Sequence, residues 1–475
     1  MLRYKGKRDE YKNSYSNRLG CRGRRYYRNF RLPVYYAIRL LESMMKKWSW
    51  FACVILFVAI VLLVRVNYWF TQSINPVTGF FLVYSFAVVI SISLRLILCE
   101  FYKPIQRDNH YTVSIIIPVF NEEKWIEKTI SHCFASDYRH LQEVIVIDDG
   151  STDSTYSILV SLQKVYPALK IIRQRVNTGK REAMILGVRA SESDVVVFID
   201  SDSFVNTDAI RKLVNTFDGG RIKGVVGHAH VYPVKGNFTE RMQEFNYYTG
   251  FTIYKKTESL FGCVTCLSGV LSAYIRTAIL EVEGEFINQS FLGQRPTAGD
   301  DRSLTTMLLR AGHKTVYQPD ALCYTVVPDN LKALTKQRVR WRRSWFRESL
   351  LQGFFFYRLN PIGALLFYST TFIGYTLIII VSRYLIFDPI NGEILSAIGF
   401  LLGCLAVVLV MESYYLWHYA KADYLSSFLY CAYNLGVLIW IIPYALVTIR
   451  NRKWETRDTL NIEDRKLSYE NTLAE

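Results

Sequence analysis

The chain has 475 residues, of which 51% are apolar, yet 57 Lys and Arg face 41 Asp and Glu, for a net charge of +16. This mixture indicates a membrane protein with a substantial water-soluble part. Nine cysteines are scattered, and only Cys263 and Cys266 lie close together. One such pair lacks the second ligand pair of a zinc site and the context of a redox motif, so we interpret it as packing.

The N-terminal residues 1–47 hold 14 basic and 3 acidic residues, a net charge of +11. A tail of this composition is expected to be disordered. We interpret it as a cytoplasmic retention signal that also contacts anionic lipid. Nucleic-acid binding is disfavoured, because no folded reader module accompanies the basic residues.

Five apolar runs are long enough to be membrane segments: 48–64, 79–99, 362–382, 394–417 and 425–449. The basic residues before the first run place the N-terminus and residues 100–350 on the cytoplasmic side. A basic cluster at 450–453 favours a cytoplasmic C-terminus too. We therefore expect the last run to be interfacial or re-entrant, leaving four spanning helices. Five or six crossings are the alternatives.

Between the two groups of apolar runs, three short β-branched segments, 113–120, 143–151 and 194–203, have the composition of buried strands. Helical patterns at 125–134 and 154–166 separate them. Alternation of strand and helix predicts an α/β domain with a mostly parallel, doubly wound sheet.

Each predicted strand ends in acidic or turn residues, which include Glu122, Asp148, Asp200 and Asp202. Any single cluster fits a turn or a helix cap equally well. In open α/β sheets, however, the ligand crevice lies at the carboxyl ends of the strands, so three clusters in a row predict one acidic cleft. The Asp200-x-Asp202 pair suits Mg²⁺ or Mn²⁺ bound together with a diphosphate.

A "NTGKREAM" stretch between the second and third strands offers Lys180 and Arg181 as phosphate partners. The alternative is a solvated loop before a helix. Neither GxGxxG nor GxxxxGK[ST] occurs, so the sequence does not support a dinucleotide or P-loop site.

Taken together, "PVFNE" at 118–122, "DDGS" at 148–151, "DSD" at 200–202, "GDDR" at 299–302 and "QRVRW" at 337–341 resemble the processive family-2 glycosyltransferases. Longer stretches, "FGCVTCLSG", "FLGQRPTAGDDRSLT" and "TIRNRKWETR", are similar to the hyaluronan synthases. The nodulation-type chitin-oligosaccharide synthases share part of this pattern, including "LGQR" and "VVPD".

The resemblance implies a GT-A-like cytoplasmic domain inserted between transmembrane helices. Its expected divisions are a tail at 1–47, two helices in 48–99, the glycosyltransferase domain at 100–330, interfacial helices at 331–360, membrane helices at 361–449 and a tail at 450–475. It implies a plasma-membrane enzyme that alternates UDP-GlcNAc and UDP-GlcA at one site. The growing polysaccharide would leave through a channel made by the enzyme's own helices.

The resemblance also implies roles for individual residues. Asp301 would be the general base and Asp300 would orient or tune it. Asp202, assisted by Asp200, would hold the metal. The residues expected to bind the nucleotide-sugar donor are Pro118, Val119, Phe120, Glu122, Asp148, Lys180, Arg181, Asp200, Arg340, Trp454, Thr456 and Arg457.

The acceptor chain and the channel would involve a second group of residues. Trp341 offers a flat apolar face to a sugar ring. The full set is Gln337, Arg338, Trp341, Cys266 and Ser268. A basic interfacial helix with aromatic anchors is the alternative for the region around 336–347.

Three other functions stay open from the sequence. The first is a synthase that makes a chitin or poly-N-acetylglucosamine product, or another exopolysaccharide, from a single UDP-sugar. The second is a transferase that makes one lipid-linked sugar, which the QxxRW pattern disfavours. The third is a transporter or receptor with a degenerate nucleotide fold, which the intact acidic residues at three strand ends disfavour.

Overall fold

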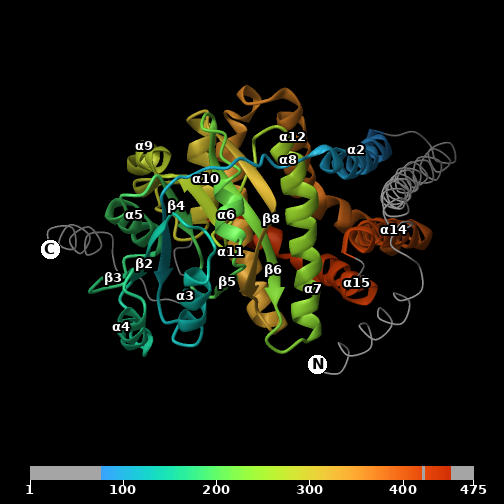
Figure 1. Cartoon of the computed structure of the whole chain (residues 1–475). Helices are drawn as coiled ribbons and strands as arrows, with labels where there is room; N and C mark the ends of the chain where they lie inside the picture. The colour runs from blue at the N-terminus through green and yellow to red at the C-terminus, as the bar shows by residue number, and fades with distance from the viewer. Residues whose placement is uncertain (1–75, 420–422, 451–475) are drawn as a thin grey trace, which may run out of the picture. The chain divides into compact units, whose positions relative to one another are not determined.

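The computed structural model describes residues 76–419 and 423–450, which all belong to one compact unit, 60–475 (Figure 1). A second unit, Met1–Ala59, lies wholly outside the described residues. Predictions for the tail at 1–47, for the apolar run at 48–64 and for 451–475 therefore lie outside the described residues as well.

The centre of the domain is an eight-stranded sheet in the order β3-β2-β1-β4-β7-β6-β8-β5. The strands are β1 (Val113–Val119), β2 (Leu141–Asp148), β3 (Leu169–Arg173), β4 (Val195–Phe198), β5 (Ser203–Val205), β6 (Ile222–Tyr232), β7 (Ser272–Ile275) and β8 (Lys314–Val326).

The three strands expected from the sequence form the parallel core of this sheet, with β1 between β2 and β4. Ile116 pairs with Ile145 on one side and with Phe198 on the other. These apolar side chains are fully or almost fully buried, as expected for a sheet covered on both faces. The β7 strand pairs antiparallel with both β4 and β6, so the sheet is mixed beyond its parallel half.

The predicted third strand, 194–203, is divided in the structure. β4 ends at Phe198, β5 begins at Ser203, and the turn between them carries Asp200 and Asp202. β5 leaves β4 and pairs antiparallel with β8 at the far edge of the sheet. The two acidic residues therefore lie where the chain crosses from one half of the sheet to the other.

Helices pack on the sheet from the loops that join its strands (Figure 1). They are α3 (Ile126–Phe134), α4 (Thr155–Val165), α5 (Lys180–Ala190), α6 (Ala209–Val214), α9 (Arg276–Ile287) and α10 (Asp300–Arg310). The approach of α5 to β1 is close, because a Cβ atom at Gly187 would lie 2.4 Å from Cγ2 of Ile116. This contact packs α5 directly against the middle of β1.

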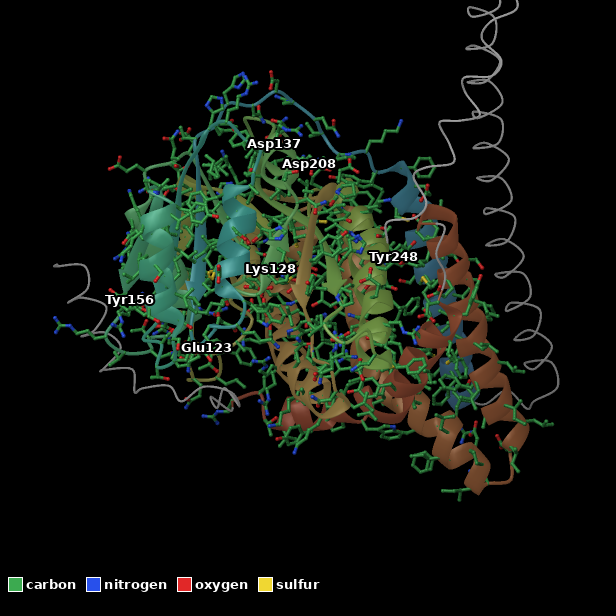
Figure 2. The ribbon with its side chains drawn as sticks, turned by 60° about the horizontal axis from the view of Figure 1, so that its bottom comes forward. Glu123, Lys128, Asp137, Tyr156, Asp208 and Tyr248 are labelled. Carbon is green, nitrogen blue, oxygen red and sulfur yellow. The ribbon has the colours of Figure 1, made fainter. Side chains whose placement is uncertain are left out.

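A second group of helices joins the domain to the apolar part of the chain. It comprises α7 (Phe238–Tyr248), η3 (Thr249–Lys255), α8 (Lys256–Leu260), α11 (Leu331–Gly353) and η4 (Phe356–Arg358). The ring of Tyr248, labelled in Figure 2, lies 4.5 Å from the ring of Tyr415 in α14. Aromatic packing of this kind holds α7 against the apolar helices.

The apolar helices are α2 (Pro76–Leu98), η2 (Cys99–Phe101), α12 (Pro361–Ser382), η5 (Arg383–Phe387), α13 (Asp388–Ile390), α14 (Ile394–Tyr419), α15 (Tyr424–Tyr433), η6 (Asn434–Leu438) and α16 (Ile441–Val447). In the described part of the chain, three segments are long and apolar enough to cross a membrane: Gly79–Phe101, Pro361–Ile390 and Ile394–Tyr415. These agree with three of the predicted runs.

The last predicted run is broken. Tyr424–Leu438 and Ile441–Val447 meet at an angle of 48°, a geometry that fits a broken span or a re-entrant loop. Within the described residues the chain thus has three candidate spans, or four if the bent pair counts as one.

Candidate active site

The carboxyl ends of β1 and β2 form one wall of the site. Val119 pairs with Asp148, and the backbone N–H of Asp149 donates to the carbonyl of Val119 over 2.9 Å. Asn121 continues the chain with a φ of 54° and donates its N–H to Oγ of Ser151 over 3.0 Å. The predicted stretch Pro118–Val119–Phe120 and the DDGS loop therefore lie side by side, as expected from a parallel sheet.

Asp148 and Asp149 have different environments. Asp148 is fully buried, where its Oδ1 accepts the N–H of Ser151 at 3.0 Å and its Oδ2 lies 3.5 Å from Nε of Arg173. Asp149, which the prediction left without a role, accepts the N–H groups of Thr178 and Gly179 at 2.7 and 2.9 Å. Burial raises the pKa of Asp149 to about 7 despite these hydrogen bonds. Its carboxyl group anchors the loop that leads into α5.

The first residue of α5 reaches across to the β4–β5 turn. Nζ of Lys180 forms a short ion pair with Oδ1 of Asp200. Burial by itself would lower the pKa of Lys180, but the carboxylates of Asp200, Asp301 and Asp300 outweigh it and raise the pKa. The residues whose charges interact here are up to 121 positions apart in the sequence. The structure thus places Lys180 between two of the predicted acidic motifs.

Negative charge accumulates around Asp202. Burial, followed by the charges of Asp200 and Glu122, raises the pKa of Asp202 to about 7, and Lys180 offsets part of this effect. The carboxylates of Asp202, Asp200 and Glu122, which Lys180 neutralises only in part, form an oxygen-rich site that fits a hard divalent cation. Within the described residues, however, no group of three His, Cys, Asp or Glu is arranged to hold a metal ion. A cation here would need further oxygen ligands from a bound molecule.

The GDD motif forms the start of α10. Gly299 precedes the helix with φ 81° and ψ 39°, the left-handed region that favours glycine. Asp300, the first helical residue, is 5% exposed and accepts Nε–H of Arg181 over 3.0 Å. Arg181 also donates to the carbonyl of Phe286 over 2.7 Å. The guanidinium of Arg181, predicted to lie along a nucleotide, is thus buried against Asp300 and orients the start of α10.

Asp301 faces a different loop. Its Oδ1 accepts the N–H of Arg302 at 2.8 Å, and its Oδ2 lies 3.6 Å from Sγ of Cys266 and 3.4 Å from the N–H of Gly269. Burial, and then the charge of Asp301, raises the pKa of Cys266 to about 12, so the thiol stays protonated. Unlike Asp300, Asp301 forms no ion pair within the described residues and remains partly accessible.

The loop that faces Asp301 is itself supported by a buried lysine. Nζ of Lys255, at the end of η3, donates to Oγ of Ser268 over 2.5 Å. Burial lowers the pKa of Lys255 to about 8, although Cys266, Asp301 and Glu258 counteract part of the decrease. The sequence offered no signal for this lysine, because it lies outside every recognised motif.

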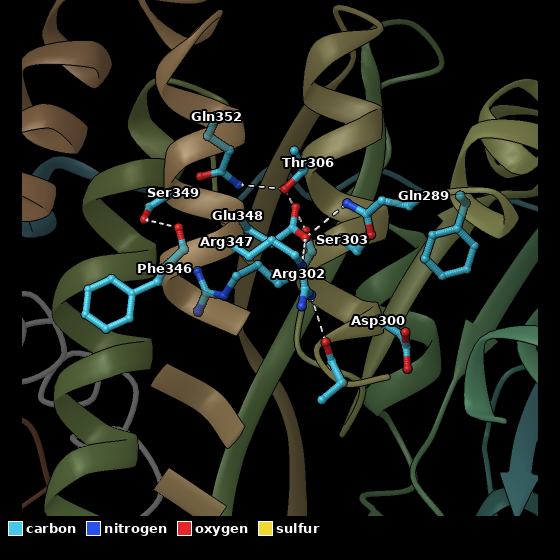
Figure 3. A network of polar contacts seen from close by, with 12 residues as sticks. Gln289, Asp300, Arg302, Ser303, Thr306, Phe346, Arg347, Glu348, Ser349 and Gln352 are labelled. Atoms are coloured by element: carbon cyan, nitrogen blue, oxygen red, sulfur yellow. Dashed lines mark hydrogen bonds and ion pairs between the residues drawn. The ribbon is translucent and has the colours of Figure 1, made fainter. Parts of the chain in front are cut away.

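A buried polar network connects α10 to α11 (Figure 3). Arg347 donates to Oε1 of Glu348 over 2.8 Å and to the carbonyl of Ala298 over 2.7 Å. Glu348 also accepts from Nε2 of Gln289 over 3.1 Å. One helical turn further, Gln352 donates to Oγ1 of Thr306 over 3.0 Å. The helix that carries the QxxRW pattern is therefore bonded to the residues on either side of the GDD motif.

The QxxRW residues lie on different sides of α11. Arg340 lines a small pocket together with Arg295, Arg343, Arg347 and Arg450. Neither Asp202 nor Asp301 lines this basic pocket. Trp341 is 43% exposed and lies 6.5 Å from the ring of Tyr247 in α7. Trp454, Thr456 and Arg457 lie outside the described residues, so their predicted roles stay predictions.

Comparison with known proteins agrees with this geometry. Residues 114–281 match the family described as Glycosyl transferase family 2. A hyaluronan synthase of Streptococcus pyogenes serotype M3 is 31% identical over 387 residues, which cover 80% of this chain and 91% of that protein. An N-acetylglucosaminyltransferase of Azorhizobium caulinodans is 28% identical over 359 residues, covering 73% of this chain and 87% of that protein.

The fold has a solved counterpart. A mannosyltransferase from Pyrobaculum calidifontis, in complex with GDP-Man and Mn²⁺, matches with a TM-score of 0.51 and 17% sequence identity over 86% of this chain and 100% of that chain. The predicted GT-A-like fold, with candidate membrane helices around it, is confirmed. The chain belongs to glycosyl transferase family 2 and is a glycosyltransferase related to the hyaluronan synthases.

Proposed function

We propose that the enzyme polymerises UDP-GlcNAc and UDP-GlcA into hyaluronan at one cytoplasmic site and exports the chain through its own membrane helices. The likeness to a hyaluronan synthase over 80% of the chain supports the donor pair. The basic residues before 48 and at 450–453 support a plasma-membrane protein with both termini in the cytoplasm.

One observation carries the proposal: residues of three predicted motifs meet at Gly269. The N–H of Gly269 lies 3.4 Å from Oδ2 of Asp301. On its other side, a Cβ atom at this position would lie 3.1 Å from both Nζ of Lys180 and Oδ1 of Asp200. A single residue without a side chain thus separates the candidate base from the candidate diphosphate site.

In the proposed reaction, Asp301 takes the proton from the hydroxyl group of the acceptor sugar. The acceptor oxygen forms a bond to C1 of the donor sugar while the bond from C1 to the UDP oxygen breaks, with inversion at C1. Lys180, which forms an ion pair with Asp200, would neutralise part of the charge that develops on the diphosphate. The Arg181–Asp300 pair keeps Asp301 at the start of α10.

Asp202 and Asp200 would hold Mg²⁺ or Mn²⁺ together with the donor diphosphate. A divalent cation there supplies Lewis-acid stabilisation of the leaving UDP. The Mn²⁺ in the Pyrobaculum mannosyltransferase complex supports this assignment. The raised pKa of Asp202 fits as well, because burial and the carboxylates of Asp200 and Glu122 disfavour its ionisation more than Lys180 favours it.

The test uses the purified full-length chain in lipid nanodiscs with both UDP-sugars and a divalent metal. We expect a polymer that hyaluronidase digests completely, and none with either donor alone. A polymer formed from UDP-GlcNAc alone would refute hyaluronan as the product.

The specific alternative is a chitin-oligosaccharide or poly-N-acetylglucosamine synthase. The 28% identity to the Azorhizobium N-acetylglucosaminyltransferase favours it. Its product would form from UDP-GlcNAc alone, would resist hyaluronidase and would be digested by chitinase or a poly-N-acetylglucosamine hydrolase.

A further inference from the structure

Arg338 is a buried cation in α11, one residue after the glutamine of the QxxRW pattern. Its side chain is 7% exposed, yet Nε and Nη2 have no hydrogen-bond partner within the part of the chain that the structure describes. Buried guanidinium groups are normally paired with an anion or with several acceptors, because desolvation without a partner is costly. Arg338 therefore departs from the usual pattern of a structural arginine.

The two unpartnered atoms are the informative ones. Nε and Nη2 lie along one edge of the guanidinium plane and donate two parallel hydrogen bonds. This edge matches the two oxygens of a carboxylate or of a phosphate in a bidentate arrangement. The structure thus presents an arginine whose complete side edge is free to bind a two-oxygen anion.

The surroundings of Arg338 favour a sugar. Its guanidinium carbon lies 4.4 Å from the centroid of the Trp341 ring, and this ring is 43% exposed. An exposed indole packs against the apolar face of a pyranose ring. Oε1 of Gln337 is also buried without a partner among the described residues and is suited to accept a hydroxyl hydrogen. A sugar that bears a carboxylate would match this combination of an aromatic ring, an amide oxygen and a guanidinium edge.

Arg338 also lies close to the acidic cleft. Burial raises the pKa of Tyr247, while the charge of Arg338 lowers it and the charges of Asp202 and Asp200 add to the increase. All three charged groups therefore act on one tyrosine hydroxyl. On the other side, Thr335, one turn earlier in α11, contacts the hydroxyl of Tyr433 in α15 at 2.6 Å. Arg338 thus lies near Tyr247 and the acidic residues on one side and near Tyr433 of α15 on the other.

We propose that Arg338 binds the carboxylate of a uronate unit in the acceptor chain, with Trp341 against the sugar ring, and thereby retains an acidic polymer between successive transfers. This inference rests on the proposed function, since it requires a uronate in the product. The other source of a two-oxygen anion is the donor diphosphate, and the experiment separates the two.

The experiment uses the full-length chain in nanodiscs with Arg338→Gln and Arg338→Lys variants. Arg342→Gln is the matched control, since Arg342 lies one turn away on the same helix and its guanidinium carbon lies 6.0 Å from the ring of Trp345, not of Trp341. Chains are labelled with both UDP-sugars, the donors are removed, and the half-life of the retained polymer is measured. The KM values of both donors and the inhibition constant of UDP are measured in parallel.

If Arg338 binds a uronate, Arg338→Gln shortens the half-life of the retained chain by about 10-fold to 100-fold and shortens the polymer, because one charge-assisted bidentate contact is lost. Arg338→Lys retains part of the effect, and Arg342→Gln behaves like the unmodified chain. Arg338 would instead bind the donor diphosphate if its loss raises both donor KM values and the UDP inhibition constant equally while chain retention stays normal.

A structural role predicts a different signature. Replacing a buried, unpaired charge with Gln leaves Tm unchanged or raises it, whereas loss of a structural contact lowers Tm. A lower Tm for both Arg338 variants together with normal retention overturns the inference. A wild-type product that resists hyaluronidase refutes the proposed function and uronate binding together. A hyaluronidase-sensitive product whose retention does not depend on Arg338 refutes only the role of Arg338.

Discussion

Gly299→Ala is expected to inactivate the enzyme by moving the start of α10. A Cβ atom at Gly299 would lie 1.9 Å from Oγ and 2.5 Å from Cβ of Ser344 in α11. Tolerable contacts begin at about 3.4 Å, so the two helices would have to separate by roughly 1 Å or more. The φ of 81° adds an independent strain for any residue with a Cβ atom.

The magnitude follows from these two contributions. The left-handed conformation costs about 1–2 kcal/mol for a residue with a side chain, and overpacking costs about 1–3 kcal/mol. A shift of about 1 Å at Asp301 would lower the transfer rate by about 100-fold. Rotation of Ser344 relieves the contact with Oγ but not the one with Cβ.

The assay measures polymer synthesis and thermal unfolding of the purified protein. Ser344→Gly removes both contacting atoms, so Gly299→Ala combined with Ser344→Gly should recover activity relative to Gly299→Ala by about 10-fold. Gly284→Ala in α9 is the matched control, because a Cβ atom there meets nothing within 4 Å. Normal activity and Tm in Gly299→Ala would refute the reasoning, as would strictly additive effects in the double variant.

Three further variants test other parts of the site. Arg181→Met leaves Asp300 buried without its cation and should lower the free energy of unfolding by about 3–5 kcal/mol. The double variant Arg181→Met with Asp300→Leu should recover most of this loss. Equal unfolding curves for the unmodified chain and both variants would contradict the pairing. Asp202→Asn should abolish the dependence of UDP binding on Mg²⁺ or Mn²⁺ in calorimetry, and unchanged metal dependence would remove Asp202 from the metal site. Burial lowers the pKa of Lys255 from 10.5 to about 8. The charged lysine therefore lowers the free energy of unfolding below about pH 8, and this free energy rises as the pH increases from about 8 to about 10.5. Lys255→Met should remove this slope in unfolding curves, and a slope that persists would contradict the assignment.

Local patterns were enough to predict the parallel half of the sheet. The runs that became β1 and β2 are β-branched and bounded by turn residues, and parallel strands bring their carboxyl ends together. The sequence could not show that the third run divides into β4 and β5, because the division depends on pairing of β5 with β8, more than 100 residues later. This division places Asp200 and Asp202 in a turn instead of at the end of one strand.

Partners distant in sequence were harder to predict. Lys180 and Arg181 are adjacent and both basic, so we expected both to be phosphate partners, but successive residues of a helix point in different directions. Lys180 reaches Asp200, whereas Arg181 is buried against Asp300. That Nε and Nη2 of Arg338 have no hydrogen-bond partner among the described residues is likewise a property of tertiary packing, which no motif encodes.

Polymer synthesis by Asp301→Asn, compared with the unmodified enzyme, tests the central claim most directly. Asn is nearly isosteric with Asp and cannot accept the proton of the acceptor hydroxyl. Both proteins are supplied with radiolabelled UDP-GlcNAc and UDP-GlcA in nanodiscs, and binding of UDP is measured on the same samples. We predict a hyaluronidase-sensitive polymer from the unmodified enzyme and a loss of at least about 100-fold in Asp301→Asn, with UDP affinity retained. Polymer synthesis at an unchanged rate by Asp301→Asn would contradict the account.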